Sequence, residues 1–459
     1  MVGLTKKRRV HFVGIGGSGM SGIAEILLNL GHKVQGSDLA RGETVERLES
    51  LGAKVMVGHA RENVGDAEVL VISSAVGEDN PEVIEARARK IPVIPRAEML
   101  AELMGMKESI AVAGAHGKTT ASTLLATILA ESGMDPTVII GGRVKQFGSG
   151  ARHGSGDFLV AEADESDGSF LTLNPTIAVV TSLDAEHISH YGSMEKIEEA
   201  FLRFCNSVPF FGAAVVCGDD PRLRAFGPKM NKKFITYGFT PGCDLVASGY
   251  NCEGMTGSFT VSNRDGELGR VELRLPGRHN ALNALSAIQV ALMLNVDFKI
   301  AASAIGSFSG IARRSEIKGE INGVTVIDDY GHHPNEIRAC IKSIKEGMKG
   351  RRLVTLFQPH RYTRTRDSLK EFFTAFEGSD LLGVLPIYAA SEEPIEGVSS
   401  SLIYDGVRAS GQENVFSLES KEQAEKWLKE NLKKDDVFLT LGAGDVYRVG
   451  EKYLRNGNS

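Results

Sequence analysis

The stretch "VAGAHGKTTAS", Val112 to Ser122, follows a run of apolar residues and opens a pattern typical of a helix. A glycine-rich turn between a strand and a helix directs backbone N–H groups toward a bound phosphate. Lys118 adds a fixed cation, and the hydroxyl of Thr119 is suited to bind Mg²⁺. The loop is shorter than the eight-residue Walker pattern, because Gly114 stands only three residues before Gly117. The stretch predicts a shortened phosphate-binding loop on a parallel α/β sheet; a chance glycine turn with a solvated lysine is the alternative.

Short apolar runs alternate with helical patterns on both sides of this loop. Strands that alternate with helices predict parallel sheets with right-handed crossovers. From about Cys243 to Leu275 the pattern changes to short strands with turn residues, which predicts a small antiparallel sheet added to the parallel one. The passage "GSFSGIARRSE" is a candidate linker near residue 311. We therefore predict an α/β fold of three domains, at residues 1–106, 107–310 and 311–459.

Composition excludes several classes of protein. The 459 residues carry a formal net charge of -6 without a basic stripe, which argues against a dedicated nucleic-acid-binding protein. No apolar run approaches the roughly 20 residues of a membrane-spanning helix. The five cysteines show neither C-x-x-C spacing nor the density of a disulfide scaffold. We expect a cytoplasmic protein with no nucleic acid or membrane partner.

Polar residues gather where two further apolar runs end. In a doubly wound sheet, ligands bind beyond the carboxyl ends of the strands, so these residues should lie at the same edge as the Lys118 loop. Each one alone is more often a loop carboxylate or a hydrogen-bonded histidine. Together, acidic groups and a neutral imidazole beside a triphosphate favour a metal site. The residues are Glu162, Asp164 and Glu165 after "FLVA", and Asp184, Glu186 and His187 after "IAVVTS".

The N-terminal stretch "VHFVGIGGSGMSGIA", Val10 to Ala24, contains a second glycine turn, in which Gly14, Gly16 and Gly19 fit G-x-G-x-x-G. A nicotinamide-dependent dehydrogenase would explain this turn, but the Lys118 loop would then have no function. A nucleotide-binding regulator is a further alternative.

Two asparagines, Asn280 and Asn283, stand at the start of a predicted helix in "LPGRHNALNALSA". They suit either helix capping or nucleotide contact.

The third predicted domain carries two polar motifs at strand ends, "IDDYGHHPNEI" and "FQPHRYTRTRD". Arginine side chains recognise carboxylates and phosphates through two parallel hydrogen bonds. We therefore predict a site for a substrate carboxylate or phosphate, although a solvated basic turn would explain any single arginine. The candidate residues are Asp329, Tyr330, His332, His333, His360, Arg361, Arg364 and Arg366.

These motifs together, in this order and over nearly the whole chain, closely resemble those of the Mur ligases. The motifs are "GIGGSGMSGIA", "AGAHGKTT", "AEADESD", "PGRHNALNA", "DDYGHHP" and "FQPHRYTRTRD". The resemblance implies an N-terminal Rossmann-like UDP-sugar domain, a central P-loop ATPase domain and a mobile C-terminal Rossmann-like domain that binds the amino acid. It also implies the reaction: ATP, with Mg²⁺, phosphorylates the lactoyl carboxylate of UDP-N-acetylmuramate, and the amine of L-alanine then displaces phosphate to form an amide. This reaction begins the peptide stem of peptidoglycan.

The resemblance also implies roles for individual residues. The residues implied in catalysis are Lys118, Glu162, His187, Asn283, Arg314 and Asp329. The residues implied to bind ATP are Gly114, Ala115, His116, Gly117, Lys118, Thr119, Thr120, His279, Asn280, Asn283, Arg314 and Asp329. Those implied to hold Mg²⁺ are Thr119, Glu162 and His187. The residues implied to bind the UDP-sugar are Gly16, Gly17, Ser18, Gly19, Met20, Ser37, Asp38, His59, Ser73 and Ser74. Those implied to line the amino-acid pocket are Tyr330, His332, His360, Arg361 and Arg364.

Two related activities stay open. A murein tripeptide ligase uses the same UDP-sugar but adds a peptide, and tends to carry bulkier residues where this chain has Ser18 and Gly19. Folylpolyglutamate synthases share the last two domains but have no N-terminal sugar domain like residues 1–106. We expect a monomer or a weak homodimer.

Overall fold

The computed structural model describes residue 4 and residues 6–144, 149–390 and 392–456, with backbone only for Ser18, Arg143, Val144 and Ser189. The chain forms two compact units. The first comprises Met1–Gly249, Phe259–Val271 and Leu282–Ser309, and the second comprises Tyr250–Ser258, Glu272–Ala281 and Gly310–Ser459. Within the described ranges, no helix combines the length and the apolar character needed to cross a membrane.

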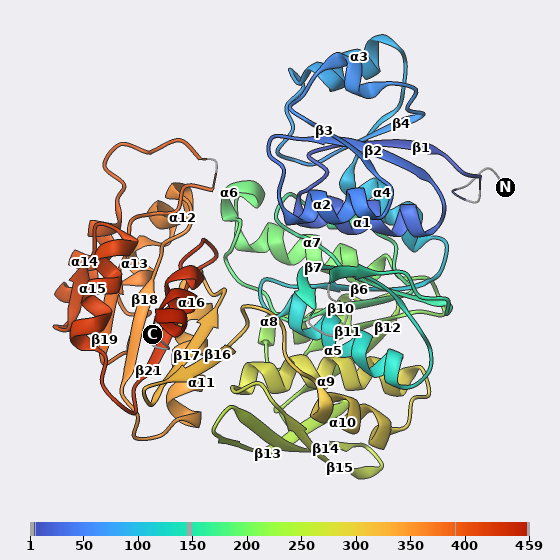
Figure 1. Ribbon diagram of the computed structural model, residues 1–459. Helices are drawn as coiled ribbons and strands as arrows, with labels where there is room; N and C mark the ends of the chain where they lie inside the picture. Colours follow the sequence, from blue (N-terminus) through green and yellow to red (C-terminus); the bar gives the residue numbers. More distant parts are fainter. Residues whose placement is uncertain (1–3, 5, 145–148, 391, 457–459) are drawn as a thin grey trace. The chain divides into compact units, whose positions relative to one another are not determined.

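The first sheet is fully parallel, with strand order β3-β2-β1-β4-β5. Helices α1, α2 and α4 lie on one side of it and α3 lies on the other (Figure 1). This covering explains why Val10, Phe12 and Val13 of β1 are all buried. The elements are β1 (Arg9–Val13), α1 (Ser18–Asn29), β2 (Lys33–Asp38), α2 (Glu43–Ser50), β3 (Lys54–Val57), β4 (Val69–Ile72), α3 (Pro81–Ala88), β5 (Val93–Pro95) and α4 (Arg96–Met104).

The second sheet has ten strands in the order β15-β14-β13-β12-β11-β10-β6-β9-β7-β8. Its centre is parallel, and β8 pairs antiparallel with β7 at one edge. The strands are β6 (Glu108–Ala113), β7 (Thr137–Val144), β8 (Ser149–Arg152), β9 (Phe158–Glu162), β10 (Ile177–Val180), β11 (Ala213–Cys217), β12 (Lys233–Gly238), β13 (Leu245–Glu253), β14 (Thr256–Asn263) and β15 (Gly266–Leu273). The helices are α5 (Lys118–Glu131), α6 (Ile188–Tyr191), α7 (Met194–Asn206), α8 (Pro221–Arg224), α9 (Arg278–Met293) and α10 (Phe298–Ser307).

The short strands predicted from Cys243 to Leu275 are present, but they extend the central sheet instead of forming a separate small one. Strand β13 joins β12 through only two residue pairs, Tyr237↔Leu245 and Gly238↔Val246. So short a junction leaves no signal in the sequence pattern, because each strand looks the same whichever sheet it joins.

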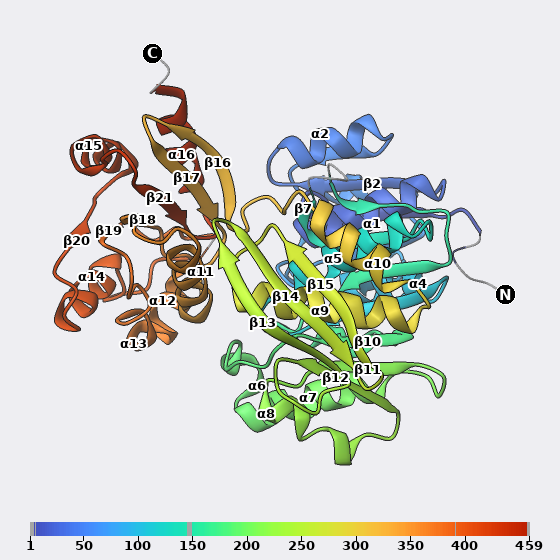
Figure 2. The same cartoon turned by 90° about the horizontal axis from the view of Figure 1, so that it is seen from below.

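The third sheet has the order β16-β17-β21-β18-β19-β20 and is parallel except for β16. Apolar residues of α11, α13 and α14 pack on one face, and those of α15 and α16 pack on the other (Figure 2). The elements are β16 (Glu316–Ile321), β17 (Val324–Asp329), α11 (Pro334–Gly347), β18 (Leu353–Phe357), α12 (Tyr362–Asp367), α13 (Leu369–Phe372), β19 (Leu381–Val384), α14 (Ser400–Ala409), β20 (Val415–Ser417), α15 (Lys421–Asn431), β21 (Val437–Leu441) and α16 (Tyr447–Asn456).

The five cysteines are buried thiols, and none forms a disulfide. Burial raises the pKa of the Cys205 thiol to about 12. The cysteines therefore serve as small core residues.

Candidate functional site

The phosphate loop, residues 114–120, lies between β6 and α5, where the sequence predicts it. Gly114 has a φ of +131°, and Gly117, which precedes α5, has a φ of +84°. A Cβ on Gly114 would collide with the Thr181 hydroxyl, and a Cβ on Gly117 would collide with the Asn283 carboxamide. Both positions therefore require glycine for the backbone angle and for space.

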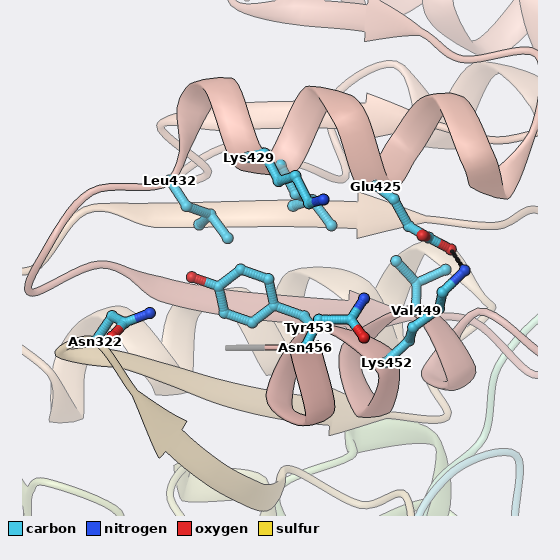
Figure 3. A pocket seen from close by; sticks show the side chains of 9 residues that line it. Asn322, Glu425, Lys429, Leu432, Val449, Lys452, Tyr453 and Asn456 are labelled. Atoms are coloured by element: carbon cyan, nitrogen blue, oxygen red, sulfur yellow. Dashed lines mark hydrogen bonds and ion pairs between the residues drawn. The ribbon is translucent and has the colours of Figure 1, made fainter. Parts of the chain in front are cut away.

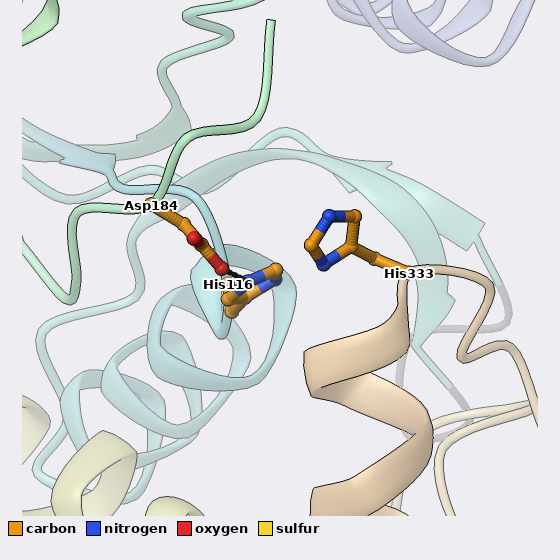
Figure 4. A group of neighbouring side chains, drawn as sticks. All are labelled: His116, Asp184 and His333. Atoms are coloured by element: carbon orange, nitrogen blue, oxygen red, sulfur yellow. Dashed lines mark hydrogen bonds and ion pairs between the residues drawn. The ribbon is translucent and has the colours of Figure 1, made fainter. Parts of the chain in front are cut away.

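Side chains from the end of β10 hold this loop. The Thr181 hydroxyl donates to the His116 carbonyl at 2.5 Å, and the His116 N–H donates to Ser182 Oγ at 3.0 Å. The His116 ring reaches Asp184, with 2.8 Å between Nε2 and Oδ2 (Figure 4). Strands β6 and β10 are neighbours, so their carboxyl ends bring these groups together. The loop is thus fixed by the adjacent strand end.

Lys118 forms an ion pair with a buried carboxylate. Its ammonium donates to Glu165 Oε1 at 2.8 Å and to the Gly114 carbonyl at 2.7 Å. Burial acts to lower the pKa of Lys118, but the charge of Glu165 outweighs it and holds that pKa above its ordinary value. Lys118 therefore stays charged and aimed into the loop.

Glu162 is the last residue of β9, and one of its two carboxylate oxygens is available to a ligand. Oε2 accepts a hydrogen bond from the Gly141 N–H at 3.0 Å. Oε1 is buried, and no hydrogen-bond partner for it exists among the described residues. A buried carboxylate oxygen without a partner is unfavourable unless a cation or donor joins it. Glu162 therefore fits the role of a Mg²⁺ ligand.

The other predicted residues near the loop occupy varied environments. His187 precedes α6 in a left-handed conformation, with φ +65°, and is half-buried. Thr119 is half-buried near the start of α5, and Thr120 is buried. The N–H of Ala115 donates to the Ser182 carbonyl at 3.1 Å. Of these, Thr119 and His187 keep side chains within reach of solvent.

The two asparagines of α9 differ in what they contact. Asn280 donates from Nδ2 to the Pro276 carbonyl at 2.7 Å, a local contact at the helix start. Asn283 lies against Gly117 of the phosphate loop. His279 and Asn280 belong to the second compact unit, whereas Asn283 belongs to the first.

The glycine turn at the N-terminus, residues 14–19, is held by the end of β2. The N–H groups of Gly14 and Ile15 donate to the Ser37 carbonyl at 2.8 and 3.0 Å. The Gly16 N–H donates to Asp38 Oδ2 at 2.8 Å. Asp38, predicted beside a uridine, thus binds the turn itself.

Other residues of the predicted sugar site are partly hidden. Met20 is 2% exposed, and its N–H donates to the Gly17 carbonyl at 3.0 Å, so it belongs to the core. The side chain of Ser18 lies outside the described residues. Ser73 is half-buried and Ser74 is exposed after β4.

A buried carboxylate that the sequence did not single out organises this region. The side chain of Glu82, on α3, is fully buried. It accepts hydrogen bonds from Ser37 Oγ at 2.6 Å, Asn63 Nδ2 at 2.7 Å and the Ala60 N–H at 3.2 Å, and pairs with His11 at 3.0 Å. Although burial alone would raise its pKa, these partners lower the pKa of Glu82 to about 2.

Glu82 also connects to the predicted sugar pocket. Ser37 is fully buried, and its Oγ lies 2.9 Å from His59 Nδ1. Both predicted residues therefore depend on Glu82 for their positions. An acidic residue in the first turn of a helix is ordinarily explained by the helix dipole, so the sequence offered no signal for this role.

In the second unit, Asp329 ends β17 and binds backbone. Its two oxygens accept from the Ser315 N–H at 2.6 Å and the Gly331 N–H at 2.7 Å. Neighbouring Asp328 pairs with Arg313 at 3.0 Å, yet burial raises the pKa of Asp328 to about 6.

The guanidinium of Arg313 also lies over the rings of Tyr330 and Tyr447, at 5.1 and 4.6 Å from their centroids. Arg314, which the sequence did single out, lies 5.2 Å from the centroid of the same Tyr330 ring and 3.9 Å from Glu336. Arg313 was missed because a buried ion pair has no signature in a single sequence.

Five predicted residues of the amino-acid pocket gather in one cluster. His332 lies between Tyr330 and His360, with ring centroids 5.4 and 5.9 Å away. Arg364 Nη1 lies 3.3 Å from the His360 carbonyl, and Arg361 adopts φ +72° at the start of α12. Strands β17 and β18 both flank β21, which explains how the two motifs meet.

The charge of this cluster is carried by its arginines. Burial lowers the pKa of His332 to about 3, and burial with the charge of Arg364 lowers the pKa of His360 to about 4. Tyr388, which the sequence did not indicate, stacks on His360 with an interplanar angle of 8°. Arg366, by contrast, pairs with Asp367 at the surface. The cluster thus combines neutral imidazoles with fixed cations, and its arginines have the chemistry to bind a carboxylate.

A separate hollow of about 250 Å³ lies between α15 and α16 (Figure 3). Its lining includes Asn322, Leu428 and Tyr453, with a Glu425–Lys452 ion pair of 2.7 Å. Asn322 precedes β17, at the opposite end of that strand from Asp329. The hollow therefore lies away from the carboxyl ends of the strands, where ligands of such sheets bind.

Comparison with known proteins covers nearly the whole chain. Residues 9–108 match the Mur ligase family, catalytic domain; residues 112–291 match the Mur ligase middle domain; residues 313–444 match the Mur ligase, glutamate ligase domain. The chain is 51% identical to a UDP-N-acetylmuramate–L-alanine ligase from Geobacter sp. (strain M21), over 98% of this chain and 97% of that one.

Solved structures agree with this similarity. The UDP-N-acetylmuramate-alanine ligase MurC from Thermotoga maritima superposes with a TM-score of 0.84 at 27% identity, covering 98% of this chain and 99% of that chain. A murein peptide ligase from Psychrobacter arcticus has the same fold, with a TM-score of 0.73 at 24% identity and coverage of 98% and 99%. Matches to all three sheets are not expected of a dehydrogenase, which would share only the first.

Proposed function

Because the chain belongs to the Mur ligase family, we propose that it joins L-alanine to the lactoyl carboxylate of UDP-N-acetylmuramate, with conversion of ATP to ADP and phosphate. The observation that carries this proposal is the similarity, over nearly its full length, to a ligase named for these two substrates. The phosphate loop and the cluster of neutral histidines and arginines supply the chemistry that such a reaction needs. We also propose domain bounds of 1–106, 107–310 and 311–459, for the UDP-sugar, ATP and amino acid in turn.

In the first step, an oxygen of the lactoyl carboxylate attacks the γ-phosphorus of ATP, and ADP leaves. Phosphorylation is required because a free carboxylate has no adequate leaving group. Lys118 neutralises charge on the transferred phosphoryl group. Glu162, His187 and Thr119 would hold Mg²⁺, which supplies further neutralisation of that charge when bound.

In the second step, the amine of L-alanine attacks the carbonyl carbon of the acyl phosphate. The tetrahedral intermediate then expels phosphate, which leaves with the proton lost from the nitrogen, and an amide remains. His332 and His360 stay neutral at pH 7, so they do not repel the incoming amine and can accept a hydrogen bond from it. Arg361 and Arg364 hold the alanine carboxylate through charge-assisted hydrogen bonds.

We further propose that the enzyme works in the cytoplasm, as a monomer or a weak homodimer, without nucleic acid or membrane partners. Its five buried thiols suit a reducing compartment.

The test is an assay of phosphate release with ATP, Mg²⁺, UDP-N-acetylmuramate and one amino acceptor at a time. We expect release with L-alanine above a control without amino acid, and weaker release with serine or glycine. The tripeptide L-Ala-D-Glu-meso-diaminopimelate should give none. Preference for the tripeptide would reassign the chain as a murein tripeptide ligase, and no release with any acceptor would refute the ligase proposal.

A further inference from the structure

Arg96, which none of the motifs includes, lies against the glycine turn. It is the first residue of α4, directly after β5, so it stands at the carboxyl edge of the first sheet. A Cβ built on Gly19 would lie 3.0 Å from Cδ, 3.2 Å from Nε and 3.3 Å from Nη1 of Arg96. The guanidinium therefore lies close to the backbone of the first turn of α1, and a side chain at position 19 would require Arg96 to shift by a few tenths of an ångström.

Among the described residues, the N–H donors of the Arg96 guanidinium are not used in hydrogen bonds. Its side chain is 19% exposed, and its charged partner is Asp164, at 3.6 Å between Nη2 and Oδ2. That separation is longer than a hydrogen bond. Over the described part of the chain, the guanidinium makes no hydrogen bond, although it has five N–H donors. The pair with Asp164, which is 48% exposed, is weak.

The glycine turn itself offers few N–H donors and little positive charge for binding an anion. The N–H of Gly16 is engaged by the Asp38 carboxylate, and the N–H of Met20 donates to the Gly17 carbonyl. Asp38 also places a negative charge at the turn. The partial positive charge at the start of α1 is then opposed locally, so a doubly charged pyrophosphate needs a cation beside it.

We infer that Arg96 binds the pyrophosphate of the UDP-sugar at the glycine turn, exchanging its weak pair with Asp164 for hydrogen bonds to phosphate oxygens. This inference rests on the proposed function, because that function supplies the UDP-sugar. Arginine suits the role because its planar fork matches two phosphate oxygens at once. In the sequence, Asp164 lies between Glu162 and Glu165, and Glu165 is the partner of Lys118. When Arg96 exchanges Asp164 for phosphate, it therefore also frees the Asp164 carboxylate beside the proposed ATP site.

Calorimetric titration of UDP and of UDP-N-acetylmuramate into the full chain and its variants tests the inference. For Arg96→Ala we expect both dissociation constants to rise by a similar factor, about 10- to 100-fold, since charge-assisted hydrogen bonds are lost. Arg96→Lys, which keeps the charge but removes the fork, should give a smaller rise. Affinity for a non-hydrolysable ATP analogue should stay within about twofold.

Two further variants separate binding from structure. Arg87→Ala is the matched control, because Arg87 is 58% exposed, pairs with Glu78 and belongs to α3, on the opposite side of the first sheet from α4 (Figure 1); it should leave all affinities unchanged. Asp164→Asn should leave UDP affinity unchanged or raise it, because the competing partner of Arg96 is lost. If Asp164→Asn weakens UDP binding as much as Arg96→Ala does, the pair between Arg96 and Asp164 only supports the local structure, and the inference is overturned.

The remaining outcomes also test the inference. Unchanged UDP affinity in Arg96→Ala or, should that variant not fold, in Arg96→Lys overturns the inference. A loss confined to UDP-N-acetylmuramate would assign Arg96 to the lactoyl carboxylate and overturn it as well. If the unmodified chain binds UDP-N-acetylmuramate, the proposed function survives any of these results; if it does not, the proposed function itself fails.

Discussion

The two glycine turns of the first unit, at residues 14–19 and 114–120, have the same backbone plan and different side chains around them. Each follows a strand and opens a helix, and each is fixed by the end of a neighbouring strand. The phosphate loop contains its own cation, Lys118, backed by Glu165. The glycine turn has an anion instead, Asp38, on its Gly16 N–H. We therefore propose that the two turns bind different ligands and that the surrounding side chains determine which one.

The largest effect should come from Lys118→Ala. Turnover should fall by about 10³-fold or more, because the charge on the transferred phosphoryl group loses its fixed cation. Affinity for UDP-N-acetylmuramate should change by less than about twofold, because we propose that this ligand binds at the other turn. Phosphate release and calorimetry would measure the two quantities, and an equal loss in both would show that the turns do not act separately.

Glu82→Gln should weaken the support of the glycine turn. The lowered pKa of Glu82, about 2 against an ordinary 4.5, means that its carboxylate stabilises the fold fully above pH 4.5. This contribution, about 3 kcal/mol, is lost as the pH falls from 4.5 toward 2. Urea unfolding across this range should therefore show a shallower acid dependence in the variant than in the unmodified chain. Parallel acid profiles would mean that Glu82 has an ordinary pKa.

Gly117→Ala and Gly14→Ala compare the two turns directly. Both residues have positive φ, +84° and +77°, but a Cβ meets the Asn283 carboxamide only at Gly117 and open space at Gly14. We expect losses in the free energy of unfolding of about 3 kcal/mol for Gly117→Ala and about 1–2 kcal/mol for Gly14→Ala. Adding Asn283→Ala to Gly117→Ala should recover part of the loss. Equal losses without recovery would indicate that strain alone matters at both turns.

The smallest effects should come from the hydroxyl groups beneath each turn. Thr181→Val removes the hydrogen bond to the His116 carbonyl, and Ser37→Ala removes the one to Glu82. Each should weaken one ligand by about 3- to 10-fold, ATP for Thr181 and the UDP-sugar for Ser37, because one hydrogen bond contributes about 1 kcal/mol. Calorimetry with both ligands and both variants measures this. A lower affinity for ATP in the Ser37→Ala variant would contradict the separation of the two turns.

Strand ends were the most predictable feature of the candidate site. Parallel strands place their carboxyl ends at one edge, so motifs that follow apolar runs can be grouped from the order of residues along the chain. His116 with Asp184, and His332 with His360, are brought together in this way. Glu82, inside α3, and Arg313, in the loop before β16, escaped prediction. Glu82 acts through Ser37 and Arg313 through Asp328, which are 45 and 15 residues away in the sequence.

The sequence by itself determined the alternation of strands and helices, the position of the phosphate loop and the membership of the family. These follow from local patterns, since hydrophobic period, glycine spacing and motif order are all read along the chain. Only the tertiary structure decided that the short strands after Cys243 extend the central sheet, that Ser37 is buried on Glu82, and that Arg96 lies on Gly19. Those facts depend on contacts between residues 45 to 77 positions apart or on a junction of two residue pairs. No local pattern encodes them, because the energy of a buried charge or a close backbone approach depends on what the fold places beside it.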